Sequence, residues 1–152
     1  RLAFAPGRWD LARLSSLAGS IPAGLSLERM RVEHVGAFSQ LDPDTVRNFG
    51  SAQRLIDDGF GFVVTKDREV IAGVATFAAG GERVEIQIDT HEAYRRLGLA
   101  SALGARMILE CLDRGLEPCW DGSNAESGGL AEKLGYVRTA EYRAWTFPAS
   151  PA

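Results

Sequence analysis

The sequence contains few residues of the kinds that form disulfides or bind metal ions. Its 152 residues include only two cysteines and two histidines. Cys111 and Cys119 are too few for a disulfide framework and lack the spacing of a metal site. We therefore expect two reduced thiols, no bound metal and a cytoplasmic location. No apolar run approaches the roughly 18 residues that span a bilayer, and no signal peptide is visible.

An excess of positive charge is also absent. The net charge is −3 at pH 7 and the pI is near 5.4. Nucleic acids and membrane surfaces attract a basic protein face, so neither is expected as a partner. Hydrophobic residues make up 45% of the chain and charged residues 24%, which is ordinary for a globular domain with a real core.

Two common phosphate-binding motifs are missing. The dinucleotide fingerprint needs three spaced glycines and an acidic residue about 20 positions further on. The phosphate loop of nucleotide hydrolases needs Gly-Lys-Ser/Thr. Neither pattern occurs, so the chain is not expected to adopt either of these nucleotide-binding arrangements.

The most informative segment that is present runs from residue 84 to residue 114. Val84, Ile86 and Ile88 alternate with polar residues, which predicts a strand. The apolar residues that follow the next loop are spaced three or four apart, which predicts one long helix that ends at Gly115.

The helix opens with Arg95-Arg96-Leu97-Gly98-Leu99-Ala100. At a helix start the first main-chain N–H groups have no partner within the helix, so they can bind an anion such as phosphate. The two arginines would add positive charge, and Gly98 would leave room for phosphate oxygens. The alternative is a basic helix start in which the glycine only makes a turn.

The remaining pattern predicts an α/β (α+β) fold with a mixed, mostly antiparallel central sheet flanked by helices. Residues 1–24 are interpreted as a connector or the remnant of a preceding region, and residues 148–152 as a tail. The other expected strands cover residues 25–32, 60–66, 69–79, 117–121, 136–140 and 142–147, and the other expected helices cover residues 35–41, 51–58 and 124–133.

This order of elements resembles the GNAT superfamily of acyl-CoA N-acyltransferases across residues 25–147. The resemblance depends on two blocks, the Arg95 to Ala100 segment and Leu130-Ala131-Glu132-Lys133-Leu134-Gly135-Tyr136. It implies a GNAT domain over residues 25–147 whose fourth and fifth strands splay apart. Residues 59–64, residues 141–145 and the absence of a tyrosine after Leu130 further resemble the zwittermicin A resistance acetyltransferase branch, in which a further region would precede Arg1.

The resemblance also implies a cofactor site for acetyl-CoA or coenzyme A as co-substrate, without a metal. The main chain after the fourth strand would contact the pantetheine arm, and the helix start would hold the pyrophosphate. The implied contacts are Ile88, Asp89, Thr90, Arg95, Arg96, Leu97, Gly98, Leu99, Ala100, Ser101 and Asn124.

One position departs from the family pattern, because Ala131 stands where many relatives carry a tyrosine that protonates the leaving thiolate. Ser127, Tyr136 and Tyr142 are candidates to supply that proton. As general base we consider Glu85, because it lies on the fourth strand between apolar neighbours that would raise its pKa. Its alternative role is that of an ordinary solvent-facing glutamate.

Two aspartates, Asp89 and Asp121, end strands near the same place. Either could bind a cationic amine, although each residue is also typical of a turn or cap. His91 is expected to be exposed.

The function implied is an N-acetyltransferase that moves an acetyl group from acetyl-CoA to a primary amine of a small molecule or peptide. Direct attack is expected, because neither cysteine is placed as an activated nucleophile. A catalytically silent acyl-CoA sensor and a purely structural domain are the alternatives. Family members often pair, so a homodimer is possible.

Overall fold

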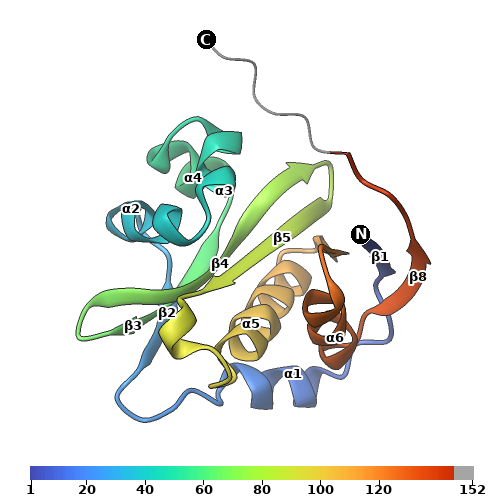
Figure 1. The fold of residues 1–152 in the computed structure, drawn as a ribbon, viewed down its shortest axis with the longest axis horizontal. Coiled ribbons are helices and arrows are strands. Elements are labelled where there is room, and N and C mark those ends of the chain that lie inside the picture. Colours follow the sequence, from blue (N-terminus) through green and yellow to red (C-terminus); the bar gives the residue numbers. More distant parts are fainter. Residues whose placement is uncertain (146–152) are drawn as a thin grey trace.

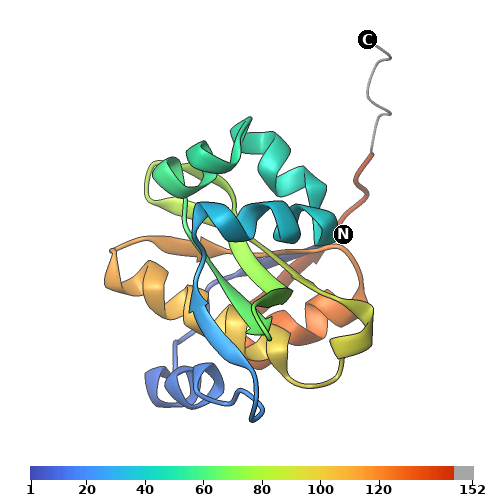
Figure 2. The ribbon, with the colours of Figure 1, turned by 90° about the vertical axis from the view of Figure 1, so that its left-hand side faces the viewer.

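A computed structural model describes residues 1–145 and places helices on both faces of a five-stranded sheet (Figures 1 and 2). The strands are β1 (Leu2–Ala5), β2 (Ser26–Arg29), β3 (Gly61–Lys66), β4 (Glu69–Gly80), β5 (Arg83–Thr90), β6 (Glu117–Cys119), β7 (Asp121–Gly122) and β8 (Val137–Glu141). The helices are α1 (Leu11–Ala18), α2 (Val32–Leu41), α3 (Pro43–Phe49), α4 (Ala52–Asp58), the 3-10 helix η1 (Glu92–Tyr94), α5 (Leu99–Asp113) and α6 (Ala125–Leu134). None of these helices combines the length and apolar character needed to cross a membrane.

The main sheet has the order β2-β3-β4-β5-β6, and only its last pair is parallel. The tight β3–β4 turn is made by Asp67 and Arg68, whose φ angles of 49° and 70° suit the strand twist of a two-residue hairpin. The predicted mixed, mostly antiparallel sheet flanked by helices is therefore confirmed.

The fourth and fifth strands of this sheet, β5 and β6, separate after three residue pairs. The parallel register joins Arg83 to Glu117, Val84 to Pro118 and Glu85 to Cys119, and then stops. The chain passes through the buried Trp120 into β7, which pairs with β1 in a second sheet of order β7-β1-β8. The predicted splay is thus confirmed, but the strand expected over residues 117–121 is divided between two sheets.

A bulge in β4 lies at the same level as this separation. The register between β4 and β5 shifts between Thr76 and Ala78, opposite Ile86 and Glu85. A bulge bends its strand and increases the local twist, and bulges are common beside active sites. The sheet therefore changes direction where β6 leaves it.

Two hydrophobic clusters hold the layers together. The larger lies between the sheet and α1, α5 and α6, and the smaller packs α2, α3 and α4 against the opposite face. In the larger cluster α5 comes very close to α6, because a Cβ on Gly104 would stand 2.6 Å from Cδ1 of Leu134. A larger residue at this position would push the two helices apart.

Three expectations from the sequence differ from the structure. Residues 1–24, expected as a connector, contain β1 and α1; β1 pairs with both β7 and β8, and α1 packs on α5. The two expected last strands reduce to β8, residues 142–145 are irregular, and residues 146–152 lie outside the described part of the chain. The long helix begins at Leu99 rather than at Arg95.

A cluster of three arginines around one buried carboxylate ties α5 to the edge strand β2. Glu110, only 7% exposed, accepts hydrogen bonds from Arg29 at 2.7 Å, Arg106 at 2.9 Å and Arg114 at 2.9 Å. Burial would raise the pKa of Glu110, but the bonds from Arg29 and Arg114 outweigh it and lower the pKa to about 2. Phe62 lies beneath the guanidiniums of Arg29 and Arg106.

We predict that Glu110→Gln lowers the free energy of unfolding by about 1 to 3 kcal/mol, because three guanidiniums lose their shared carboxylate. The control is Glu132→Gln at the exposed pair with Arg138, where a loss below about 1 kcal/mol is expected. Urea unfolding followed by circular dichroism measures both values.

The same substitution should also change how stability depends on pH. The folded pKa of Glu110 lies below its ordinary value of 4.5, so the stabilisation is complete above pH 4.5 and is lost as the pH falls toward about 2. The free energy of unfolding of Glu110→Gln should therefore fall less steeply than that of the unmodified protein between pH 4.5 and about 2. If Glu110→Gln and Glu132→Gln lowered the free energy of unfolding equally, the stabilising role assigned to Glu110 would be wrong.

Candidate active site

The turn between β5 and α5 presents a row of main-chain amides without acceptors. The first hydrogen bond donated into α5 runs from Ala102 N to Gly98 O at 3.1 Å, and within residues 1–145 no acceptor faces the N–H groups of residues 96–101. Two residues of this turn, Arg96 and Gly98, have positive φ angles of 65° and 79°. Unpaired N–H groups at a helix start carry partial positive charge, so this turn can bind an anion.

Gly98 is suited to this turn by its backbone conformation and not by packing. Its left-handed φ favours glycine, and a Cβ added there would meet no atom within 4 Å. Open space therefore lies beside the amides, where a larger side chain would compete with a bound group.

Lys133 is a cation at this turn that sequence reasoning missed. Its Nζ donates a hydrogen bond of 2.9 Å to the hydroxyl of Ser101 in the first turn of α5. An ammonium close to the positive end of a helix is unfavourable unless an anion lies nearby. Lys133 belongs to the second motif block, so the sequence contained it. Its contact with α5 could not be predicted, because α6 meets α5 only in the folded chain.

The two predicted arginines lie at the same turn. Arg95 directs its Nε toward the carbonyl oxygen of Thr90 at 3.5 Å, and both Arg95 and Arg96 are exposed. Together with Lys133 they give the turn three cationic side chains. This charge and the unpaired amides favour an anion with more than one negative charge.

The last residues of β5 have a strand partner on one side only. Ile88, Asp89 and Thr90 pair with β4, whereas the pairing with β6 has already ended at Glu85. A free strand edge can hydrogen-bond an extended ligand through main-chain groups. The hydroxyl of Thr90 is buried and has no hydrogen-bond partner among the described residues.

A row of polar side chains lies on the face of β5 opposite α5. Val84 and Ile86 are buried in the core with α5, so the alternating Glu85, Gln87 and Asp89 point to the other face, where they are half-buried. Burial, and then the charge of Asp121, raise the pKa of Glu85. Burial likewise raises the pKa of Asp89, whose carboxylate accepts a hydrogen bond of 2.8 Å from Gln87.

Asp121 is the next charged group on this side of the separating strands. Its Oδ2 accepts hydrogen bonds from Arg1 Nε at 2.8 Å and from the Tyr142 hydroxyl at 2.6 Å. Its Oδ1 is buried and has no partner among the described residues. The bond to Asp121 raises the pKa of Tyr142, which keeps this phenol protonated.

The remaining predicted site residues gather around the start of α6. Asn124 caps the helix by accepting a 2.9 Å bond from Ser127 N, and its amide NH₂ can donate to a ligand. The hydroxyl of Ser127 accepts a 3.2 Å bond from Trp120 Nε1. Ala131 is fully buried. The Tyr136 hydroxyl is enclosed and has no hydrogen-bond partner within residues 1–145, and burial raises the pKa of Tyr136.

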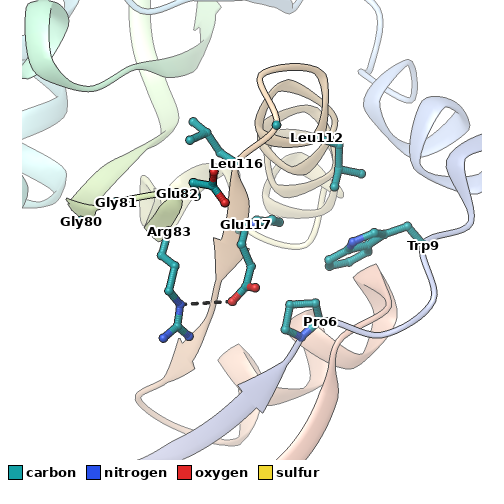
Figure 3. Close-up of a pocket in the computed structure, with 11 residues that line it drawn as sticks. Pro6, Trp9, Gly80, Gly81, Glu82, Arg83, Leu112, Leu116 and Glu117 are labelled. Atoms are coloured by element: carbon teal, nitrogen blue, oxygen red, sulfur yellow. Dashed lines mark hydrogen bonds and ion pairs between the residues drawn. The ribbon is translucent and has the colours of Figure 1, made fainter.

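A hollow in the described chain lies elsewhere. It measures about 720 Å³ and is rimmed by Trp9, Leu116 and the Arg83–Glu117 ion pair of 3.1 Å (Figure 3). These residues surround the far end of α5, about 20 Å from the unpaired amides at a rise of about 1.5 Å per residue. The hollow therefore contains none of the predicted site residues.

The sequence matches the family model described as GNAT acetyltransferase over residues 2–145. A curated relative, the uncharacterized N-acetyltransferase YdfB of Bacillus subtilis strain 168, is 35% identical over 127 residues, which are 80% of this chain and 48% of YdfB. The crystal structure of a GCN5-related N-acetyltransferase-like protein from Streptococcus suis superposes with a TM-score of 0.87 at 34% identity, over 92% of this chain and 57% of that one. The chain thus spans about half the length of these relatives.

A more distant structure shares the fold. Aminoglycoside N-acetyltransferase AAC(6')-Iy in complex with CoA has a TM-score of 0.64 at 15% identity, over 82% of this chain and 100% of that one. The zwittermicin A resistance branch stays a prediction. The family match over nearly the whole described chain, with two relatives above 30% identity, shows that this chain belongs to the GNAT acetyltransferase family.

Proposed function

We propose that this chain binds acetyl-CoA and transfers its acetyl group directly to a primary amine of a small molecule or peptide. The observation that carries the proposal is the row of unbonded amides at residues 96–101, next to the free edge of β5. Coenzyme A has a diphosphate for such amides and an extended amide-containing arm for such an edge.

In this proposal the diphosphate is held by the amides of residues 96–101. Arg95, Arg96 and Lys133 balance its charge, and Lys133 already lies beside Ser101. The pantetheine arm runs along Ile88 to Thr90 toward Asn124, whose free amide NH₂ can donate to it. The thioester then lies where β5 and β6 separate.

Glu85 is the proposed general base. An ammonium group cannot attack, so the acceptor must lose a proton before its lone pair forms the new C–N bond and the C–S bond breaks. Glu85 has no ion-pair partner among residues 1–145, and its raised pKa makes it a better proton acceptor than an ordinary carboxylate. Glu85 forms the last β5–β6 pair with Cys119, so it lies where the two strands separate.

The cysteines support direct attack over a covalent enzyme intermediate. Cys111 is fully buried and its pKa is raised to about 12 by burial. Burial also raises the pKa of Cys119. A thiol with a raised pKa forms little thiolate near neutral pH and is a poor nucleophile.

The leaving thiolate needs little help, because thiol pKa values are near 8.5. Ala131 offers no hydroxyl. The proposed proton donors are Ser127 and Tyr142, because Tyr136 is only 3% exposed and a ligand cannot reach its hydroxyl without rearrangement.

The first test is binding. Calorimetric titration with acetyl-CoA should show binding that Gly98→Glu abolishes, because the added carboxylate would stand beside the amides and repel the diphosphate. Lys133→Met should raise Kd about 3- to 10-fold through the loss of one phosphate contact.

Gly24→Glu is the matched control for Gly98→Glu. Gly24 is also exposed, has φ of 84° and has open space around its Cβ, so it adds the same charge and backbone strain away from the site. It should bind as the unmodified protein does. No binding by the unmodified protein, or equal binding by Gly98→Glu, would defeat the cofactor assignment.

The second test is turnover, measured as thiol release with a panel of amines. Glu85→Gln should lower kcat about 10²- to 10⁴-fold, the range typical for removal of a general base. At saturating amine, kcat of the unmodified protein should rise with pH through a pKa above the ordinary glutamate value of 4.5, and Glu85→Gln should lack this rise.

The control for this test is Glu82→Gln on the exposed β4–β5 turn, which should keep normal kcat. Acetyl-CoA binding without turnover of any amine would favour a catalytically silent sensor, an alternative that the buried Ala131 keeps open. Turnover that Glu85→Gln leaves unchanged would remove Glu85 from the mechanism.

A further inference from the structure

We propose that Lys133 is a modification site at which a small acyl phosphate, such as acetyl phosphate, acetylates the side chain and weakens cofactor binding. The inference rests on the proposed function, because it concerns the regulation of that same site. It depends on where Lys133 is held, on the anion-binding groups around it, and on how the acyl group of the donor is joined to its phosphate.

Lys133 is held beside the first turn of α5 by two features of the fold. Its Nζ donates a 2.9 Å hydrogen bond to the hydroxyl of Ser101, which is only 8% exposed. The next residue, Leu134, is buried against α5, where a Cβ on Gly104 would stand 2.6 Å from Leu134 Cδ1. Lys133 itself is exposed, so solutes can reach it. The amine is thus fixed next to the unpaired amides of residues 96–101 while it remains accessible.

The positive charge at this turn is not balanced by carboxylates of the described chain. Within residues 1–145, Lys133, Arg95 and Arg96 form no ion pair. Glu132, the residue before Lys133, pairs with Arg138 instead. Cations without partners and a row of free N–H groups attract a phosphate. A small phosphate bound at this turn therefore lies within reach of Lys133 Nζ.

An acyl phosphate differs from acetyl-CoA in how far its acyl group lies from its phosphate. In acetyl-CoA bound as proposed, the pantetheine arm separates the diphosphate at residues 96–101 from the thioester at the separation of β5 and β6. In acetyl phosphate the acetyl group is joined directly to the phosphate. A phosphate on these amides thus brings the carbonyl carbon of acetyl phosphate, but not that of acetyl-CoA, next to Nζ, and holding two reactants together accelerates their reaction.

The transfer conserves atoms and charge. The ammonium group of Lys133 first loses a proton to solvent, and the nitrogen lone pair attacks the acetyl carbonyl carbon. The N–C bond forms as the C–O bond to phosphate breaks, phosphate leaves with the electron pair of that bond, and the nitrogen releases a second proton. The resulting amide carries no charge, so acetylated Lys133 no longer attracts a diphosphate, and its acetyl group adds bulk beside the amides.

Lys66 and Lys133 are the only lysines in the sequence, which gives the test an internal control. Lys66 is also exposed, but its Nζ lies over the ring of Tyr94, 5.4 Å from the centroid. Incubation with acetyl phosphate and peptide mass spectrometry should show that Lys133 is acetylated about 10-fold faster than Lys66 or more. Saturating coenzyme A, which carries no acetyl group, should remove this preference because it occupies the turn. N-acetylimidazole, an acetyl donor without phosphate, should modify both lysines at similar rates.

The second measurement is cofactor affinity after the same incubation. Acetyl phosphate should raise the Kd of the unmodified protein for coenzyme A by about 3-fold or more, because one phosphate contact is lost. Lys133→Arg keeps the positive charge and cannot be acetylated at this position, so its Kd should not change on incubation. Lys66→Arg is the matched control and should respond as the unmodified protein does.

The outcomes separate this inference from the proposed function. Equal acetylation of the two lysines by acetyl phosphate, or the same preference with N-acetylimidazole, would overturn the recruitment of the acyl phosphate while the acetyltransferase activity would stand. Selective acetylation of Lys133 with an unchanged Kd would overturn the regulatory role. If the unmodified protein bound no coenzyme A, the proposed function and the regulatory role would both be wrong, and the modification site alone would be decided by the first measurement.

Discussion

The unpaired main-chain amides of residues 96–101 are the feature on which the other parts of the site depend. Three features of the fold hold these amides in place. Leu99 and Leu103 anchor α5 in the larger core, and the pairing of β5 with β4 fixes the strand that leads to the turn. Positive φ angles at Arg96 and Gly98 turn the chain so that the amides remain unbonded. A rigid turn with unsatisfied donors needs no rearrangement to bind an anion, which reduces the ordering cost of binding.

The separation of β5 from β6 supplies the second requirement, a free strand edge beside those amides. It has two visible causes. Trp120 is buried on the α5 side of the sheet, and the chain after it joins β1 in the second sheet instead of continuing along β5. The bulge between Thr76 and Ala78 bends the neighbouring strand at the same level. The burial of Trp120, the pairing of β7 with β1 and the bulge in β4 thus all contribute to the separation of β5 from β6.

Sequence reasoning succeeded where the signal was local. The helices expected over residues 51–58 and 124–133 correspond to α4 and α6, and the three strands before the turn at residues 96–101 follow the alternation of their residues. It failed for long-range pairing, because nothing near Leu2–Ala5 indicates that β1 lies between β7 and β8. The contact of Lys133 with Ser101 and the bonds of Asp121 likewise join residues far apart in the chain, so only the fold reveals them.

Nitrogen–proton correlation NMR during a titration with coenzyme A tests the role of these amides most directly, since each amide reports its own hydrogen bond. The amide signals of residues 96–101 should shift downfield and saturate together, while those of the control segment around Gly24 stay in place. A titration in which coenzyme A binds and shifts other signals but leaves residues 96–101 unchanged would contradict the role assigned to this turn.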